Sequence, residues 1–388
     1  MQVYLVGGAV RDALLDRHVT ERDYVVVGAT PKEMLQKGFT QVGKDFPVFL
    51  HPKTGEEYAL ARTERKSGKG YTGFVCDASS DVTLEEDLKR RDLTVNAMAQ
   101  SAQGSIIDPY NGQRDLQNRI LRHVSEAFSE DPLRVFRIAR FAARYTYLGF
   151  TIAAETKALM TEMAQSGELQ SLSAERVWQE TKRSLLEGNP EVFFEILASV
   201  GALQTWFVEL ESTLSVSIAT LKTSVQCQNI IAAEQSTDPL LPLLIRFTSL
   251  VVGLNDSDVE QLCNRLKVQN QVSEVAILAS KFKATLLQTS IEKDEEASNL
   301  LSLFNGTDAW RRPERFSQIL SAFTPYALTQ SNNWEYRKQE VISALNAANS
   351  VNVQDIIAKG FKGPQIREAL NTEKLAVIEG VINVQPHE

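Results

Sequence analysis

Leu5-Val6-Gly7-Gly8-Ala9-Val10-Arg11-Asp12 is the stretch from which the fold can be predicted. It predicts a strand that ends in two glycines, followed by a helix from about Ala9 to Leu15. Because glycine has no side chain, backbone N–H groups and the start of a helix can approach a phosphate closely there. A plain turn without a ligand is the alternative. Gly8 is therefore a candidate nucleotide-binding residue.

An acidic pair, Glu21 and Asp23, precedes the β-rich run Tyr24-Val25-Val26-Val27. Residues i and i+2 of a strand point to the same face, so we expect the two carboxylates to converge. Carboxylate oxygens suit Mg²⁺, which keeps open positions for substrate phosphates. Two such ions about 4 Å apart can activate a 3′-hydroxyl and stabilise a leaving pyrophosphate. Glu21 and Asp23 are the candidate catalytic and metal-binding residues, and a solvated strand edge is the alternative.

Three consecutive basic residues occur in Leu88-Lys89-Arg90-Arg91-Asp92-Leu93-Thr94-Val95-Asn96. The planar fork of arginine can bond two phosphate oxygens at once, so this segment suits a triphosphate. Asp92 and Asn96 are expected to hold the arginine or to meet sugar hydroxyls. A solvated basic turn is the alternative.

The whole chain has 388 residues, which is too long for one ordinary core and predicts two to four domains. Its net charge of −8 would discourage a nucleic-acid partner, but arginine is dense in two clusters of the amino-terminal half. The first residues predict a strand rather than a secretory signal. The longest apolar run, Leu240 to Leu254, is interrupted by Pro242 and Arg246 and is too short to cross a bilayer. Three scattered cysteines argue against a disulfide framework, so we expect a cytoplasmic protein without a membrane partner.

The hydrophobic pattern changes near Ser129 from short β-rich runs to long helical periods, in which Val135, Ile138, Ala139, Phe141 and Ala142 recur at helical spacing. Val3 to Val6, Tyr24 to Val27, Glu57 to Ala61 and Ile106 to Ile107 are the expected strands. We predict an α/β head over 1–125, then a helical neck over 126–200, a helical body over 201–310 and a helical tail over 311–388. Pro313-Glu314 is expected to open a new helix.

These motifs resemble the palm of the nucleotidyltransferase superfamily that includes DNA polymerase β, and more closely the bacterial class II tRNA nucleotidyltransferases, or CCA-adding enzymes. The resemblance covers residues 1 to about 190 and returns at Gly360-Phe361-Lys362-Gly363-Pro364. It implies a polymerase β-like head before an all-α neck, body and tail. It also implies addition of C, C and A to tRNA from CTP and ATP, without a template and with Mg²⁺. The sequence leaves the oligomeric state open, and a monomer is favoured. The matching segments are the glycine turn with Arg11, the acidic pair, Arg90 to Ala97, Asp108-Pro109-Tyr110-Asn111-Gly112 with Asp115-Leu116, and Ser129-Glu130-Asp131-Pro132-Leu133-Arg134.

The last of these segments is the family's base-selecting element, and its chemistry follows from its residues. Ser129 is expected to cap a helix. Asp131 and Arg134 are three residues apart and are therefore expected on one face of that helix. Cytosine and adenine both present an amino donor beside a ring-nitrogen acceptor. Asp131 can accept from the amino group while Arg134 donates to the ring nitrogen. Uracil and guanine invert that pattern and would leave polar groups unpaired, at about 1 to 3 kcal/mol each.

Further residues are assigned around this element. Arg137 and Arg140 continue its helix face and are predicted to bind the nucleotide, as are Arg11 and Arg91. Three glycines between Gly68 and Gly73 predict a mobile loop, which the family uses in the switch from C to A addition. Glu175-Arg176 resembles a neck motif and is expected to pair helices rather than to touch substrate. Glu57 is a candidate third carboxylate, with an exposed acid on an edge strand as the alternative.

Two departures from the family matter. Glu21 stands where the family usually has aspartate, so the metal geometry can shift. Some relatives carry a histidine-aspartate phosphohydrolase site, but the stretch from Ala202 to Asn371 contains no histidine, so that site cannot be built there. Partial CC-only or A-only addition, a poly(A) polymerase, and an RNA-binding protein without catalysis remain the alternatives.

Overall fold

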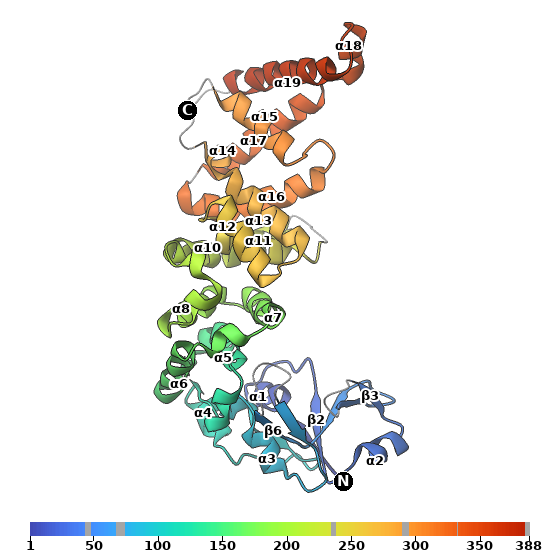
Figure 1. Cartoon of the computed structure of the whole chain (residues 1–388), viewed down its shortest axis with the longest axis vertical. Coiled ribbons are helices and arrows are strands. Elements are labelled where there is room, and N and C mark those ends of the chain that lie inside the picture. Colours follow the sequence, from blue (N-terminus) through green and yellow to red (C-terminus); the bar gives the residue numbers. More distant parts are fainter. Residues whose placement is uncertain (43–47, 67–73, 234–237, 289–294, 332, 385–388) are drawn as a thin grey trace. The chain divides into compact units, whose positions relative to one another are not determined.

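The computed structural model describes residues 1–388 except 43–47, 67–73, 234–237, 289–294, 332 and 385–388. The chain divides into two compact units, Met1–Trp206 and Phe207–Glu388 (Figure 1). The first unit therefore joins the predicted head and neck, and the second joins the predicted body and tail. The finer division into four domains stays a prediction.

The first unit is built on a mixed sheet, in which the described residues form seven strands in the order β3-β4-β5-β2-β1-β8-β9. The β2–β5 pair is parallel, whereas the other pairs are antiparallel. All four predicted strands are confirmed within a residue or two. Because β5 lies between β4 and β2, Glu57 is not on an edge strand, so this part of the alternative is wrong, although Glu57 is exposed as the alternative stated. The strands are β1 (Gln2–Val6), β2 (Asp23–Val27), β3 (Thr40–Val42), β4 (Val48–Leu50), β5 (Glu57–Leu60), β8 (Ala99–Gln100) and β9 (Ile106–Ile107).

Each face of this sheet has its own apolar core, because successive side chains of a strand alternate between faces. Val25 packs on one face with Leu88 of α3 (Leu84–Lys89). Val26 packs on the other face with Met34 of α2 (Pro31–Gln36). Asp23 pairs in register with Glu57, so the two acids stand side by side where β2 and β5 begin. The glycine turn follows the end of β1 at the same edge, since Val6 pairs with Asp23.

The predicted mobile loop falls between two paired strands, β6 (Thr63–Lys66) and β7 (Phe74–Asp77). Residues 67–73 lie outside the described part of the chain. The prediction of mobility therefore stays a prediction.

Helices and short turns complete the first unit. Helix α5 (Leu133–Tyr145) buries Val135, Ile138, Ala139 and Ala142, whose helical spacing was read from the sequence. It packs against α7 (Ala174–Leu185) and α8 (Pro190–Ser199). The other elements are α1 (Gly8–Leu14), α4 (Gly112–Gln117), α6 (Ala154–Gln165), α9 (Leu203–Trp206), β10 (Ile120–Leu121), β11 (Thr151–Ile152), and the 3₁₀ turns η2 (Thr94–Asn96), η3 (Glu126–Glu130), η4 (Thr146–Leu148) and η5 (Glu168–Ser171).

The second unit is helical throughout its described residues, as predicted. Pro313 opens α16, which confirms the predicted start, and Gly306 ends α15. None of the described helices combines the length and apolar character needed to span a membrane. The elements are η6 (Val208–Leu210), α10 (Leu214–Ala233), α11 (Leu241–Val251), α12 (Asp256–Leu266), α13 (Asn270–Lys281), α14 (Lys283–Leu287), α15 (Glu296–Gly306), α16 (Pro313–Gln330), α17 (Trp334–Asn349), α18 (Val353–Ala358) and α19 (Pro364–Val384).

Candidate functional site

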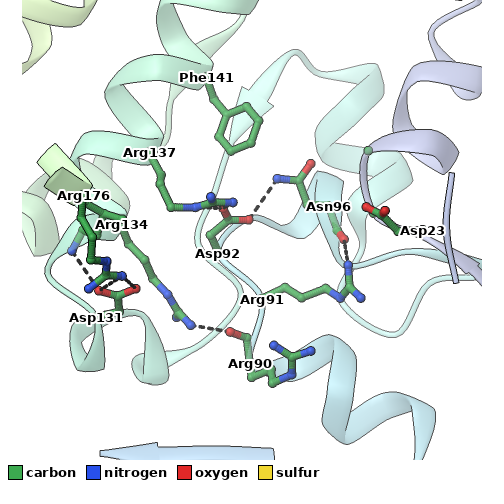
Figure 2. Close-up of a pocket in the computed structure, with 13 residues that line it drawn as sticks. Asp23, Arg90, Arg91, Asp92, Asn96, Asp131, Arg134, Arg137, Phe141 and Arg176 are labelled. Carbon is green, nitrogen blue, oxygen red and sulfur yellow. Dashed lines mark hydrogen bonds and ion pairs between the residues drawn. The ribbon is translucent and has the colours of Figure 1, made fainter. Parts of the chain in front are cut away.

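A cavity of about 380 Å³ lies in the first unit, and we call it the arginine pocket. Five arginines and three aspartates line it, together with the glycine turn. Excess positive charge in a concave site favours a polyanion such as a triphosphate. Figure 2 shows the arginines converging from α5, α7 and the segment after α3. The lining residues are Gly7, Gly8, Asp23, Arg90, Arg91, Asp92, Asn96, Asp131, Leu133, Arg134, Arg137, Phe141 and Arg176.

The glycine turn brings the backbone against Arg91. Gly7 has φ +69°, a conformation that side chains with a Cβ rarely adopt, and its N–H donates to Met98 O at 3.2 Å. A Cβ built on Gly7 would lie 2.9 Å from Nη1 of Arg91. The backbone angle therefore favours glycine at this position, and a Cβ would displace the guanidinium of Arg91.

We expect Gly7→Ala to raise the KM for the nucleotide, because the new methyl group displaces Arg91. The backbone strain should also lower the free energy of unfolding by about 1 to 3 kcal/mol. Gly104→Ala is the matched control, since Gly104 has φ +86° but nothing within 4 Å of its Cβ position. Steady-state kinetics and urea unfolding check both effects. Equal KM values for the two variants would contradict the role assigned to Gly7.

Asp87 holds the two arginines of the predicted triphosphate segment. Its buried carboxylate accepts from Arg90 Nη2 at 2.8 Å and from Arg91 Nη2 at 3.2 Å. Burial alone would raise the pKa of Asp87, but the charges of Arg90 and Arg91 outweigh it, so the pKa lies below its usual range. Sequence analysis missed Asp87, although its spacing of three and four residues from the arginines is a helical ion-pair signal.

Asp92 holds Arg137 at the centre of the arginine pocket (Figure 2). Its Oδ2 accepts from Arg137 Nε at 2.8 Å and Nη2 at 2.6 Å, while its Oδ1 accepts from Asn96 Nδ2 at 3.0 Å. Burial opposes ionisation of Asp92, but the charge of Arg137 and these hydrogen bonds lower its pKa far below the usual range. Asp92 was expected to hold an arginine of its own segment, and instead it holds one from α5.

This lowered pKa makes the protein sensitive to acid. A group whose pKa is lower in the folded state stabilises the fold above its unfolded pKa, about 3.9 for aspartate, and loses that effect as pH falls toward the folded value. We expect Asp92→Asn to cost about 2 kcal/mol at pH 7, since hydrogen bonds to a charged group are lost. Urea unfolding should show that this difference narrows below about pH 4. If the difference in free energy of unfolding between wild type and Asp92→Asn did not change with pH, the lowered pKa assigned to Asp92 would be wrong.

The base-selecting element is arranged differently from the prediction. Ser129 lies in η3 and its hydroxyl donates to Glu126 O at 2.8 Å, so the predicted cap is wrong. Asp131 has an extended backbone and lies just before α5. Its side chain accepts a hydrogen bond from Leu133 N at 3.1 Å, so Asp131 rather than Ser129 binds a free backbone N–H group at the start of α5. Asp131 therefore reaches the pocket from the turn before α5, and Arg134 reaches it from the first turn.

Arg176 was missed as a pocket residue. Its Nη2 donates to Asp131 Oδ2 at 2.9 Å, which ties α7 to the base-selecting element as the neck motif predicted. It also lines the pocket, so the expectation that it stays away from the substrate site is not supported. Arg134 donates to Ala127 O at 2.9 Å and to Arg90 O at 2.5 Å.

The acidic pair lies at the border of the arginine pocket with a second cavity of about 570 Å³. Asp23 lines both cavities, whereas Glu21 lines only the second one, together with Glu57. Burial and the nearby charge of Glu21 raise the pKa of Asp23, and Arg91 lowers it in part. Glu21 precedes β2, which begins at Asp23, so the predicted placement of both carboxylates on one strand is wrong, although both line the second cavity.

Two predicted nucleotide-binding residues do not line the arginine pocket. Arg11 is 4% exposed, and its guanidinium donates to Asp12 at 3.1 and 3.0 Å and to Asn96. Arg140 is 6% exposed and donates to Glu180 Oε2 at 2.6 Å. Carboxylates of the protein already bind these guanidinium groups. Binding of the nucleotide by Arg11 and Arg140 stays a prediction.

Comparisons with known proteins identify the family of this chain. A model described as the Poly A polymerase head domain matches residues 3–122, and one described as the probable RNA and SrmB-binding site of polymerase A matches residues 149–214. The CCA-adding enzyme of Alteromonas mediterranea is 64% identical over 401 residues, which cover 98% of this chain and 100% of that protein. The chain belongs to the CCA-adding enzyme family. The multifunctional CCA protein of Pseudoalteromonas atlantica is 48% identical, over 97% of this chain and 99% of that protein.

Solved CCA-adding enzymes share the fold at low sequence identity. One apo form has a TM-score of 0.73 at 22% identity and covers 99% of this chain, with 92% of its own chain matched. The Thermotoga maritima CCA-adding enzyme complexed with tRNA has a TM-score of 0.69 at 21% identity and covers 100% of this chain and 88% of its own. The predicted polymerase β-like head followed by helices is thereby confirmed. As a member of the family the chain is an enzyme, a CCA tRNA nucleotidyltransferase.

Proposed function

We propose that this CCA-adding enzyme binds the triphosphate of CTP or ATP in the arginine pocket. The 3′-hydroxyl of tRNA then attacks the α-phosphate beside Asp23, so that the nucleoside monophosphate is joined to the tRNA and pyrophosphate is released. The observation that carries the proposal is that Gly8, Asp23 and the base-selecting residues line one cavity. Arg90, Arg91 and Arg137 supply positive charge for the phosphates. Asp131 and Arg134 supply the acceptor and donor that cytosine and adenine share.

Mg²⁺ fits the donor set next to this pocket. Glu21 and Asp23 line the same cavity. Burial raises the pKa of Asp23, and the nearby charge of Glu21 adds to this effect with a repulsion that a bound cation would relieve. No group of three or more potential ligands in metal-binding geometry occurs among the described residues, so substrate phosphates would complete the coordination. Bound Mg²⁺ would supply charge stabilisation at the reacting phosphate. Glu21 and Asp23 would hold it, and Glu57 stands beside Asp23.

The remaining residues orient the reactants. The lowered pKa of Asp92 keeps its carboxylate ionised, which fixes Arg137 in the pocket. Asp87 fixes Arg90 and Arg91 in the same way. Preorganised cations of this kind stabilise the negative charge that develops on the transferred phosphate and the leaving pyrophosphate.

Incubation of the purified enzyme with a tRNA lacking its CCA end tests the proposal. We expect two C residues and one A to be added when CTP and ATP are both present, and no extension with UTP or GTP. Long A tracts would support a poly(A) polymerase, and addition of C alone or A alone would support a partial enzyme. Incorporation that fails although tRNA is bound would support the non-catalytic alternative.

The cellular setting follows from the same function. We propose that the enzyme acts in the cytoplasm as a monomer, with tRNA as its only macromolecular partner. Gel filtration with light scattering measures the oligomeric state directly.

A further inference from the structure

Arginines and aromatic rings alternate along one face of α5. Phe141 and Tyr145 are four residues apart, hence neighbours on the helix, and their rings lie 8° from parallel with centroids 6.2 Å apart. The guanidinium of Arg137 lies 5.8 Å from the Phe141 ring, and that of Arg144 lies 5.5 Å from the Tyr145 ring. We call these four residues, with Arg17 and Tyr147, the α5 stripe.

The stripe is continuous with the arginine pocket. Its inner residues, Arg137 and Phe141, line that pocket, and Figure 2 shows the Phe141 ring beyond the Arg137 guanidinium. At the outer end, Arg17 lies 5.4 Å from the Tyr145 ring and 5.7 Å from the Tyr147 ring. A chain of cation–π contacts, joined by the stacked rings of Phe141 and Tyr145, therefore leads from the pocket to the surface.

The outer end carries exposed groups suited to RNA. Tyr147 is 59% exposed, and the side chain of Arg144 is 32% exposed. Arg144 forms an ion pair with Asp12, whose Oδ2 lies 3.8 Å from Nη2 of Arg144, beyond hydrogen-bond distance. Within the described residues, Arg144 donates no hydrogen bond, so its guanidinium has donors available for a phosphate.

We propose that the outer end of the α5 stripe binds the unpaired 3′ end of the tRNA, with a base stacked on Tyr147 and a phosphate on Arg144. The inference rests on the proposed function, because the strand that receives the nucleotide must pass close to the pocket that holds it. Stacking on an aromatic ring requires an unpaired base, which the 3′ end of tRNA offers. Base stacking of this kind contributes about 1 to 3 kcal/mol.

A short RNA hairpin that ends in an unpaired CC tests this assignment with the full-length enzyme. Tyr147→Ala should weaken binding of the hairpin by about tenfold, since the stacking surface is lost, whereas Tyr147→Phe keeps the ring and should bind normally. Arg144→Gln should reduce the slope of log Kd against log salt by about one. The KM for CTP should not change in these variants. Lys32→Gln on α2 is the control for the loss of a surface charge, with no expected effect.

A blunt hairpin without the unpaired CC serves as the control RNA. Tyr147→Ala should not change the Kd of this blunt hairpin. Equal Kd values and salt slopes for Tyr147→Ala, Arg144→Gln and Lys32→Gln would overturn the proposal. A raised KM for CTP with unchanged hairpin binding would also overturn it, because the stripe would then serve the nucleotide. If the wild-type enzyme incorporated no nucleotide but Tyr147→Ala still lost hairpin binding, the proposed function would fail while this assignment stood.

Discussion

Asp23→Asn is expected to lower the rate of nucleotide incorporation by about a thousandfold, which corresponds to about 4 kcal/mol of transition-state stabilisation. Asp23 lines both cavities, so in the proposed complex it lies beside the triphosphate bound in the arginine pocket. Asparagine keeps the shape but removes the charge that a cation requires. Single-turnover incorporation of CTP into a tRNA lacking its CCA end measures the loss.

The matched variant is Glu21→Gln, since Glu21 lines only the second cavity. Glu21→Gln should lower the rate of nucleotide incorporation less than Asp23→Asn does. Removing the charge of Glu21 should also lower the pKa of Asp23. The tRNA Kd should stay near the wild-type value in both variants. A fully active Asp23→Asn enzyme would show that the acidic pair does not perform the chemistry.

Local sequence patterns predicted the elements that carry the site. The β-branched run before Val27, the two glycines after Val6 and the helical spacing from Val135 to Ala142 each depend on neighbours within a few residues. All three signals gave the correct element within a residue or two. Where one local signal competed with another, the prediction was wrong: Asp131, two residues after Ser129, bonds the start of α5 instead.

The partners of the arginines could not be predicted in the same way, because they are distant in the chain. Arg140 pairs with Glu180 and Arg176 pairs with Asp131, forty and forty-five residues away respectively. The spacing of the arginines along α5 shows which of them share a helix face. It cannot show which of their guanidinium groups is bound by a carboxylate from a distant part of the chain. Arg11 and Arg140 were therefore assigned to the nucleotide, and Arg176, which does line the pocket, was not.

Asp131→Ala is expected to have the largest effect on base selection. In the proposed complex Asp131 accepts the amino group of cytosine or adenine, and uracil or guanine would present an acceptor to its charge. Removing the carboxylate should weaken CTP and ATP use and remove the penalty against UTP. At about 1 to 3 kcal/mol for an unpaired buried group, the preference for CTP over UTP should fall by about 10 to 100-fold. Competition between CTP and UTP in single-nucleotide incorporation measures the ratio.

Arg176→Ala tests whether Arg176 positions the carboxylate of Asp131. The Arg176 guanidinium holds Asp131 at 2.9 Å, so its loss frees the carboxylate to rotate but leaves its charge in place. Selectivity should therefore fall less than in Asp131→Ala, and Arg176→Lys should recover part of it, because lysine keeps the charge but not the planar fork. The double variant should match Asp131→Ala, since Arg176 acts on the base through Asp131. Additive losses would instead mean that Arg176 contacts the nucleotide independently, as its position in the pocket lining also allows.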